Sequence, residues 1–149
     1  MTKQLFVIKE KTIKASPEQV WEVITTPQYF NQWMFVPGQV AGNRKLRSGS
    51  KIQWINDEGS TYLEGEVIEF ITEKKLVISL RDISWPPTVP EHSVTYEYHL
   101  EENKDGTAVK FHLGDLSVDP EAESWYNSYN SSDEIGEIEG LIRSGTLSG

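Results

Sequence analysis

Alternation of apolar and polar residues between positions 51 and 113 constrains the fold more than any other feature of this sequence. Five segments, 51–56, 61–70, 76–80, 93–100 and 107–113, place apolar side chains at about every second position, as strands with one buried face do. The stretches "DEGS", "TEKK" and "EENKDG" between them are rich in turn-forming residues. The pattern predicts a sheet of antiparallel hairpins, and its apolar face requires a covering layer.

The segment at 61–70 changes phase part-way along. Leu63, Gly65 and Val67 share one face, but the apolar positions then move to Ile68 and Phe70. A β-bulge inserts one residue and shifts the phase in this way, and it also bends the strand. We therefore expect a bulge near Val67 and a curved sheet.

The segments at 93–100 and 107–113 predict a hairpin. A turn centred on residues 105–106 pairs Tyr98 with Leu113 and sets His99 opposite His112 on the outward face. Two imidazoles with a carboxylate could ligate zinc or iron, yet the spacing supplies no further ligand. We expect surface histidines and no metal ion.

Helix signals flank the sheet. Ser16 suits an N-cap, Pro17 suits the first helical position, and Gln19 completes a capping box. Thr26 and Pro27 end this helix and start another, because the residue before a proline avoids the helical region. Two short helices are therefore expected after a first strand within residues 3–14.

A final helix is predicted to begin around Pro120. Weak helix formers at 127–132 interrupt it, and Ser131 with Glu134 is interpreted as a second capping box. Whether the helix is continuous past Asn130 stays open. Residues 143–149 are expected to form a flexible tail.

Composition narrows the class of protein. The 149 residues are expected to form a single domain over positions 1–149, with no apolar run long enough to cross a membrane and no secretory leader. A net charge of −9 disfavours nucleic acid and anionic lipid as partners, and the absence of cysteine fits a cytoplasmic location. The basic stretch "RKLRSGSK" is interpreted as a solvated loop, with a small-anion or acidic-partner patch as the alternative.

Several motifs together resemble the START-like, birch-pollen-allergen-like (SRPBCC) superfamily, in the branch of the activator of heat-shock-protein-ninety ATPase homologue-like proteins. The motifs are "ASPEQVW" with Trp33, Gly65–Val67 with Glu69, Tyr98–Leu100 with Gly106, Thr107 and Val109, and Trp125. The resemblance implies an α+β helix-grip fold, in which a curved antiparallel sheet of about six to seven strands wraps around a long C-terminal helix. Members include carriers of hydrophobic ligands, cyclases and co-chaperone domains, so the fold does not decide the function.

The inward-facing aromatic residues are the candidate ligand-binding set. A filled aromatic core and a mostly apolar pocket with a few polar groups both fit them. Buried tyrosine hydroxyls need partners, so two inward tyrosines suggest water or a polar ligand group between them. The candidate residues are Trp33, Trp54, Tyr96, Tyr98, Phe111, Trp125 and Tyr129. Trp85, in the proline-rich loop at 81–93, could gate such a cavity or anchor its loop in the core.

The leading hypothesis is a protein that binds a small hydrophobic or aromatic ligand between the sheet and the C-terminal helix, without a cofactor. The alternatives are a co-chaperone-like protein-interaction module and a cyclase- or hydrolase-like enzyme. An enzyme is the least expected of the three, because the inward positions supply no carboxylate pair and Tyr96 or Tyr98 would have to act as the acid. The chain is expected to be a monomer or a homodimer.

Overall fold

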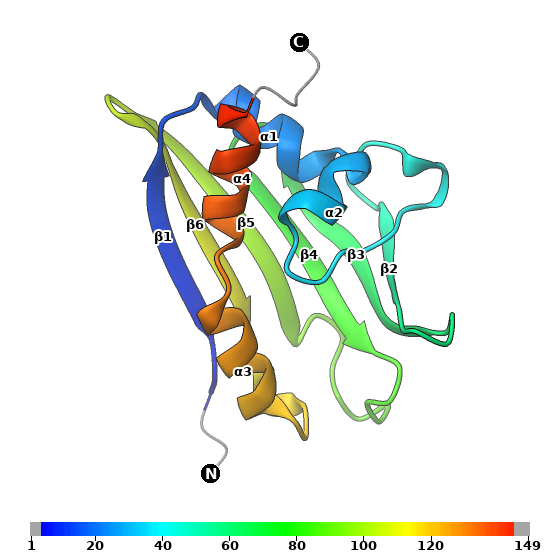
Figure 1. Cartoon of the computed structure of the whole chain (residues 1–149). Helices are drawn as coiled ribbons and strands as arrows, with labels where there is room; N and C mark the ends of the chain where they lie inside the picture. The colour runs from blue at the N-terminus through cyan, green and yellow to red at the C-terminus, as the bar shows by residue number, and fades with distance from the viewer. Residues whose placement is uncertain (1–3, 145–149) are drawn as a thin grey trace.

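The computed structural model describes residues 4–144, and its centre is a six-stranded antiparallel sheet with all helices on one face (Figure 1). The strand order is β1-β6-β5-β4-β3-β2, so the first strand pairs with the last and β1 and β2 form the edges. The α+β helix-grip class is thereby confirmed. The strands are β1 (Val7–Ile13), β2 (Lys51–Ile55), β3 (Thr61–Ile71), β4 (Lys75–Asp82), β5 (Val94–Asn103) and β6 (Gly106–Gly114).

The helix pair after β1 forms where the sequence predicts it. Ser16 caps α1 (Pro17–Thr25), with its side chain accepting from the Gln19 N–H and its own N–H donating to the Gln19 side chain. A 3-10 turn, η1 (Pro27–Tyr29), then leads into α2 (Phe30–Trp33). Further 3-10 turns are η2 (Ala41–Asn43) and η3 (Leu116–Val118).

The predicted bulge lies in β3, where the pairing with β4 shifts between Val67 and Glu69. Before the shift, Trp54 of β2 pairs with Leu63 and Ile52 pairs with Gly65, and these residues share the buried face. The bend lets the sheet curve toward the helices.

The turn between β5 and β6 is centred on Lys104 and Asp105, one residue earlier than predicted, so the predicted register is wrong by two residues. Tyr98 pairs with Phe111, and His112 pairs with Glu97 rather than with His99. Only two residues separate the strands, and the Asn103 side chain accepts the backbone N–H of the second. Because a shift of two residues preserves the strand faces, the inward-facing set is unchanged.

The C-terminal helix is broken into α3 (Ala122–Ser131) and α4 (Glu134–Arg143). Asp133 caps α4 through the Gly136 N–H, so the predicted capping box of Ser131 and Glu134 is wrong. The two halves pack differently: α4 carries four buried residues and lies against α1 and α2, whereas no residue of α3 is fully buried. Of the tail predicted at 143–149, residues 145–149 lie outside the described part.

Candidate functional site

An aromatic pocket of about 180 Å³ opens where α3 passes the ends of β2 and β3. Its walls come from the segment after α2, from the two strands and from one face of α3. We call this cavity the aromatic pocket. Its lining residues are Phe35, Val36, Trp54, Tyr62, Leu63, Ser124, Trp125, Ser128 and Tyr129.

Trp54 forms one wall of the aromatic pocket because two glycines leave room for its ring. A Cβ on Gly65 would lie 3.0 Å from Trp54 Cζ3, and one on Gly38 would lie 3.0 Å from Trp54 Cε2. The indole N–H donates to the Val36 carbonyl at 2.9 Å, which satisfies the polar edge of the ring. The wall is therefore fixed in place, and only 2% of Trp54 is exposed.

The opposite wall is formed by rings of α3 that contact other rings. Tyr129 meets Phe35 edge-on, with 5.1 Å between ring centroids, and stacks on Phe111 at 6.4 Å. Trp125 lies 6.4 Å from Trp85. These contacts hold α3 over the sheet through aromatic rings that are only partly buried.

A buried carboxylate lies behind the aromatic pocket. Glu134, which is 5% exposed, accepts from the hydroxyls of Tyr96 and Tyr98 on Oε1, at 2.7 and 2.8 Å. Its Oε2 accepts from the Phe35 N–H at 2.8 Å. The polar partner of the inward tyrosines is therefore this side chain, which ties α4 to the sheet and to the segment after α2.

Burial sets the protonation behaviour of this cluster. Removal from water raises the pKa of Glu134, although the Phe35 N–H and the two tyrosine hydroxyls favour its charged form and oppose that rise. Burial, reinforced by the charge of Glu134, raises the pKa of Tyr96 and Tyr98 well above the ordinary tyrosine value. Both hydroxyls therefore stay protonated and act as donors near neutral pH.

The aromatic residues named from the sequence separate into layers. Trp54, Trp125 and Tyr129 line the aromatic pocket. Behind them lie four rings in mutual contact, and these four are buried: Trp33, Tyr96, Tyr98 and Phe111. Trp85 is also buried, and its indole N–H donates to Asp119 Oδ2 at 2.6 Å, which anchors the loop after β4 beside η3.

Sequence reasoning missed Glu134 and the loop residues Phe35 and Val36. Glu134 precedes the buried Ile138 and Leu141 by four and seven positions, so helical spacing places it on the inward face. That spacing, together with two tyrosines that needed an acceptor, was the available signal. The two loop residues carry no periodic signal, because they lie between α2 and β2 outside any regular element.

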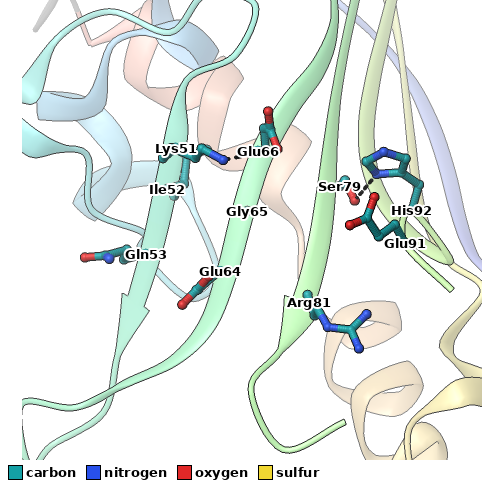
Figure 2. Close-up of a pocket in the computed structure, with 10 residues that line it drawn as sticks. All are labelled: Lys51, Ile52, Gln53, Glu64, Gly65, Glu66, Ser79, Arg81, Glu91 and His92. Atoms are coloured by element: carbon teal, nitrogen blue, oxygen red, sulfur yellow. Dashed lines mark hydrogen bonds and ion pairs between the residues drawn. The ribbon is translucent and has the colours of Figure 1, made fainter. Parts of the chain in front are cut away.

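A second, more polar cavity lies on the outer face of the sheet, across β2, β3 and β4 (Figure 2). It measures about 440 Å³, and several of its polar and charged side chains have partners. Lys51 pairs with Glu66 at 3.2 Å, His92 Nδ1 lies 2.7 Å from Ser79 Oγ, and Arg81 donates to two carbonyls of the loop after β4. Because most residues that line this groove are charged or polar, we place the candidate ligand site in the aromatic pocket.

The outward histidines meet on one carboxylate. Glu97 contacts His99 Nε2 at 2.8 Å and His112 Nδ1 at 3.4 Å, and it also accepts from Thr95. These hydrogen bonds and nearby imidazoles outweigh desolvation and lower the pKa of Glu97. Within residues 4–144, no group of three His, Cys, Asp or Glu side chains is arranged to hold a metal ion.

The comparison with protein families matches residues 14–134 to the model described as activator of Hsp90 ATPase homolog 1-like protein. The chain belongs to this family. The match confirms the resemblance that the sequence motifs indicate. A comparison with curated proteins finds no match, and no helix in the described residues is both long and apolar enough to span a membrane.

Several solved structures of other proteins share the fold. Protein MLL2253 from Mesorhizobium loti aligns with a TM-score of 0.73 and 19% identity, over 95% of this chain and 99% of that chain. The Aha1 dimer from Colwellia psychrerythraea aligns at 0.67 and 17%, over 96% and 99%. DynU16, a putative protein in the dynemicin biosynthetic locus, aligns at 0.70 and 16%, over 96% of this chain but 49% of that chain. At these identities the likeness shows the fold alone.

Proposed function

We propose that this protein binds a small hydrophobic aromatic ligand in the aromatic pocket. One observation carries the proposal: the aromatic side chains of α3 are only partly buried and line a cavity, whereas α4 carries four buried residues and packs against α1 and α2. Partly buried tryptophan and tyrosine rings around a cavity gain free energy when an apolar ligand removes them from water.

The size of the aromatic pocket narrows the ligand class. Sites for drug-sized ligands usually occupy about 300–1,000 Å³, and this pocket measures about 180 Å³. One aromatic ring, or two fused rings, matches that space. The hydroxyls of Ser124 and Ser128 on the α3 side offer hydrogen bonds to a single polar substituent.

Isothermal titration calorimetry with β-naphthol tests the proposal. A ligand of this size, at about 0.5 kcal/mol per non-hydrogen atom, should bind with a Kd on the order of 0.1 mM. Ser128→Phe should weaken binding at least about tenfold, because an added ring at a lining position occupies the space of the ligand.

Asn130→Phe is the matched control. It adds the same ring to an exposed position of α3 two residues further on, on the opposite side of the helix. This variant should bind β-naphthol as the unchanged protein does. Equal binding by both variants, or no heat of binding for the unchanged protein, would reject the proposal.

A further inference from the structure

Phe35 stands between two cavities. Besides the aromatic pocket, it lines a second cavity of about 310 Å³ at the junction of α2 with α4, and it is the residue that the two linings share. We call this second cavity the acidic cavity. Its lining residues are Asn31, Gln32, Trp33, Met34, Phe35, Ser132, Asp133, Glu134 and Glu137.

The backbone around Phe35 is held on both sides, whereas its ring has little support. The Phe35 N–H donates to Glu134 Oε2 at 2.8 Å, and the carbonyl of Val36 accepts the indole N–H of Trp54 at 2.9 Å. Phe35 is 47% exposed, and its ring meets that of Tyr129 edge-on. Removing the ring should therefore open the boundary without releasing the loop.

We propose that Phe35 sets the length of ligand that the aromatic pocket accepts. This inference rests on the proposed function. With the ring in place, a ligand ends against Phe35 and is limited to one or two fused rings. Without it, the aromatic pocket and the acidic cavity join, and an elongated aromatic ligand with two linked rings fits across the boundary.

The acidic cavity also determines which chemical group is favoured at the far end of such a ligand. Asp133, Glu134 and Glu137 line it, and the ammonium of Lys9 nearby is engaged with the Ser132 carbonyl. A carboxylate accepts about four hydrogen bonds, and Glu134 uses three on Tyr96, Tyr98 and Phe35. A ligand tail that donates hydrogen bonds, such as an amine, is favoured over a carboxylate tail, which the acidic lining repels.

The experiment compares Phe35→Ala with the unchanged protein by calorimetry. The probes are β-naphthol, para-aminomethylbiphenyl and para-carboxybiphenyl. For Phe35→Ala we expect the affinity for the aminomethyl probe to rise about tenfold or more relative to β-naphthol, since a second ring is newly buried. The carboxy probe should gain less than about threefold. Ile8→Ala, which removes an exposed apolar side chain outside both cavities, should behave like the unchanged protein.

The outcomes separate the two proposals. If β-naphthol fails to bind the unchanged protein, the proposed function fails. If β-naphthol binds both proteins but Phe35→Ala shows no new preference for the longer amine, the length limit is refuted while the ligand site stands. An equal gain for the amine and carboxylate probes would refute the selection by the acidic cavity. A thermal melt of each variant verifies that it is folded.

Discussion

Replacing Tyr98 with phenylalanine tests the buried carboxylate cluster directly. Tyr98 is 0% exposed, and its ring packs edge-on against Trp33 and Tyr96. Those ring contacts survive in Tyr98→Phe, so the variant removes one hydroxyl and little else. The loss falls on Glu134, whose Oε1 keeps only the donor from Tyr96.

The expected magnitude follows from the type of hydrogen bond that is lost. A hydrogen bond to a charged group contributes about 1.5–3 kcal/mol, and a neutral one contributes about 0.5–1.5 kcal/mol. We therefore expect Tyr98→Phe to lower the free energy of unfolding by about 2 kcal/mol. For a domain of this size, that corresponds to a fall in Tm of roughly 4–8 °C.

Urea unfolding, followed by circular dichroism, measures the effect in a double-mutant cycle with Glu134→Gln. The glutamine is neutral, so the same loss of a hydroxyl should cost about 1 kcal/mol in that background. Tyr126→Phe is the control, because the Tyr126 hydroxyl has no hydrogen-bond partner among residues 4–144, and it should change stability by less than about 0.5 kcal/mol. If Tyr98→Phe costs less than about 0.5 kcal/mol, or costs the same in both backgrounds, the cluster does not stabilise the fold as argued.

Two further predictions concern the same carboxylate and the wall of the aromatic pocket. Burial raises the pKa of Glu134 above its ordinary value of 4.5, so its contribution to stability is fully present below that pH and is lost as pH rises through the folded-state pKa. The stability of the unchanged protein minus that of Glu134→Gln should fall as pH rises above about 4.5, and a pH-independent difference in urea titrations would contradict this. Gly65→Ala should cost about 1–3 kcal/mol and weaken β-naphthol binding, because the new Cβ would lie 2.9 Å from Ile78 Cγ2 and 3.0 Å from Trp54 Cζ3. Gly140→Ala meets no atom within 4 Å and should instead stabilise α4 by about 0.5–1 kcal/mol, so a neutral Gly65→Ala in the same urea assay would refute the close approach.

The faces of the strands could be predicted from the sequence, but the register of the last hairpin could not. Alternation assigns Tyr96 and Tyr98 to the inward face in any register that keeps the period of two. The register depends on where the turn is centred, and here the Asn103 side chain stabilises a turn on Lys104 and Asp105, one residue before the centre expected in the "EENKDG" stretch. The side-chain hydrogen bond in the turn therefore fixed the pairing register, which the apolar periodicity could not determine.

Part of the candidate site could also be predicted. Trp54, Trp125 and Tyr129 stand on regular elements, so the spacing along each element indicated their inward direction. Phe35 enters the site through a loop, and its position depends on a hydrogen bond to a residue 99 positions away. The role of Glu134 depends on where the helix breaks, because Asp133 caps α4 in place of the predicted Ser131.

The proposed binding of a small aromatic ligand in the aromatic pocket is tested most directly by the indole N–H resonances. The chain has five tryptophans, and those of the aromatic pocket are Trp54 and Trp125. In a β-naphthol titration followed by ¹H–¹⁵N correlation spectra, these two indole signals should move in proportion to occupancy, while that of Trp21, buried against Phe70, stays in place. Unmoved Trp54 and Trp125 signals at saturating ligand would contradict the account.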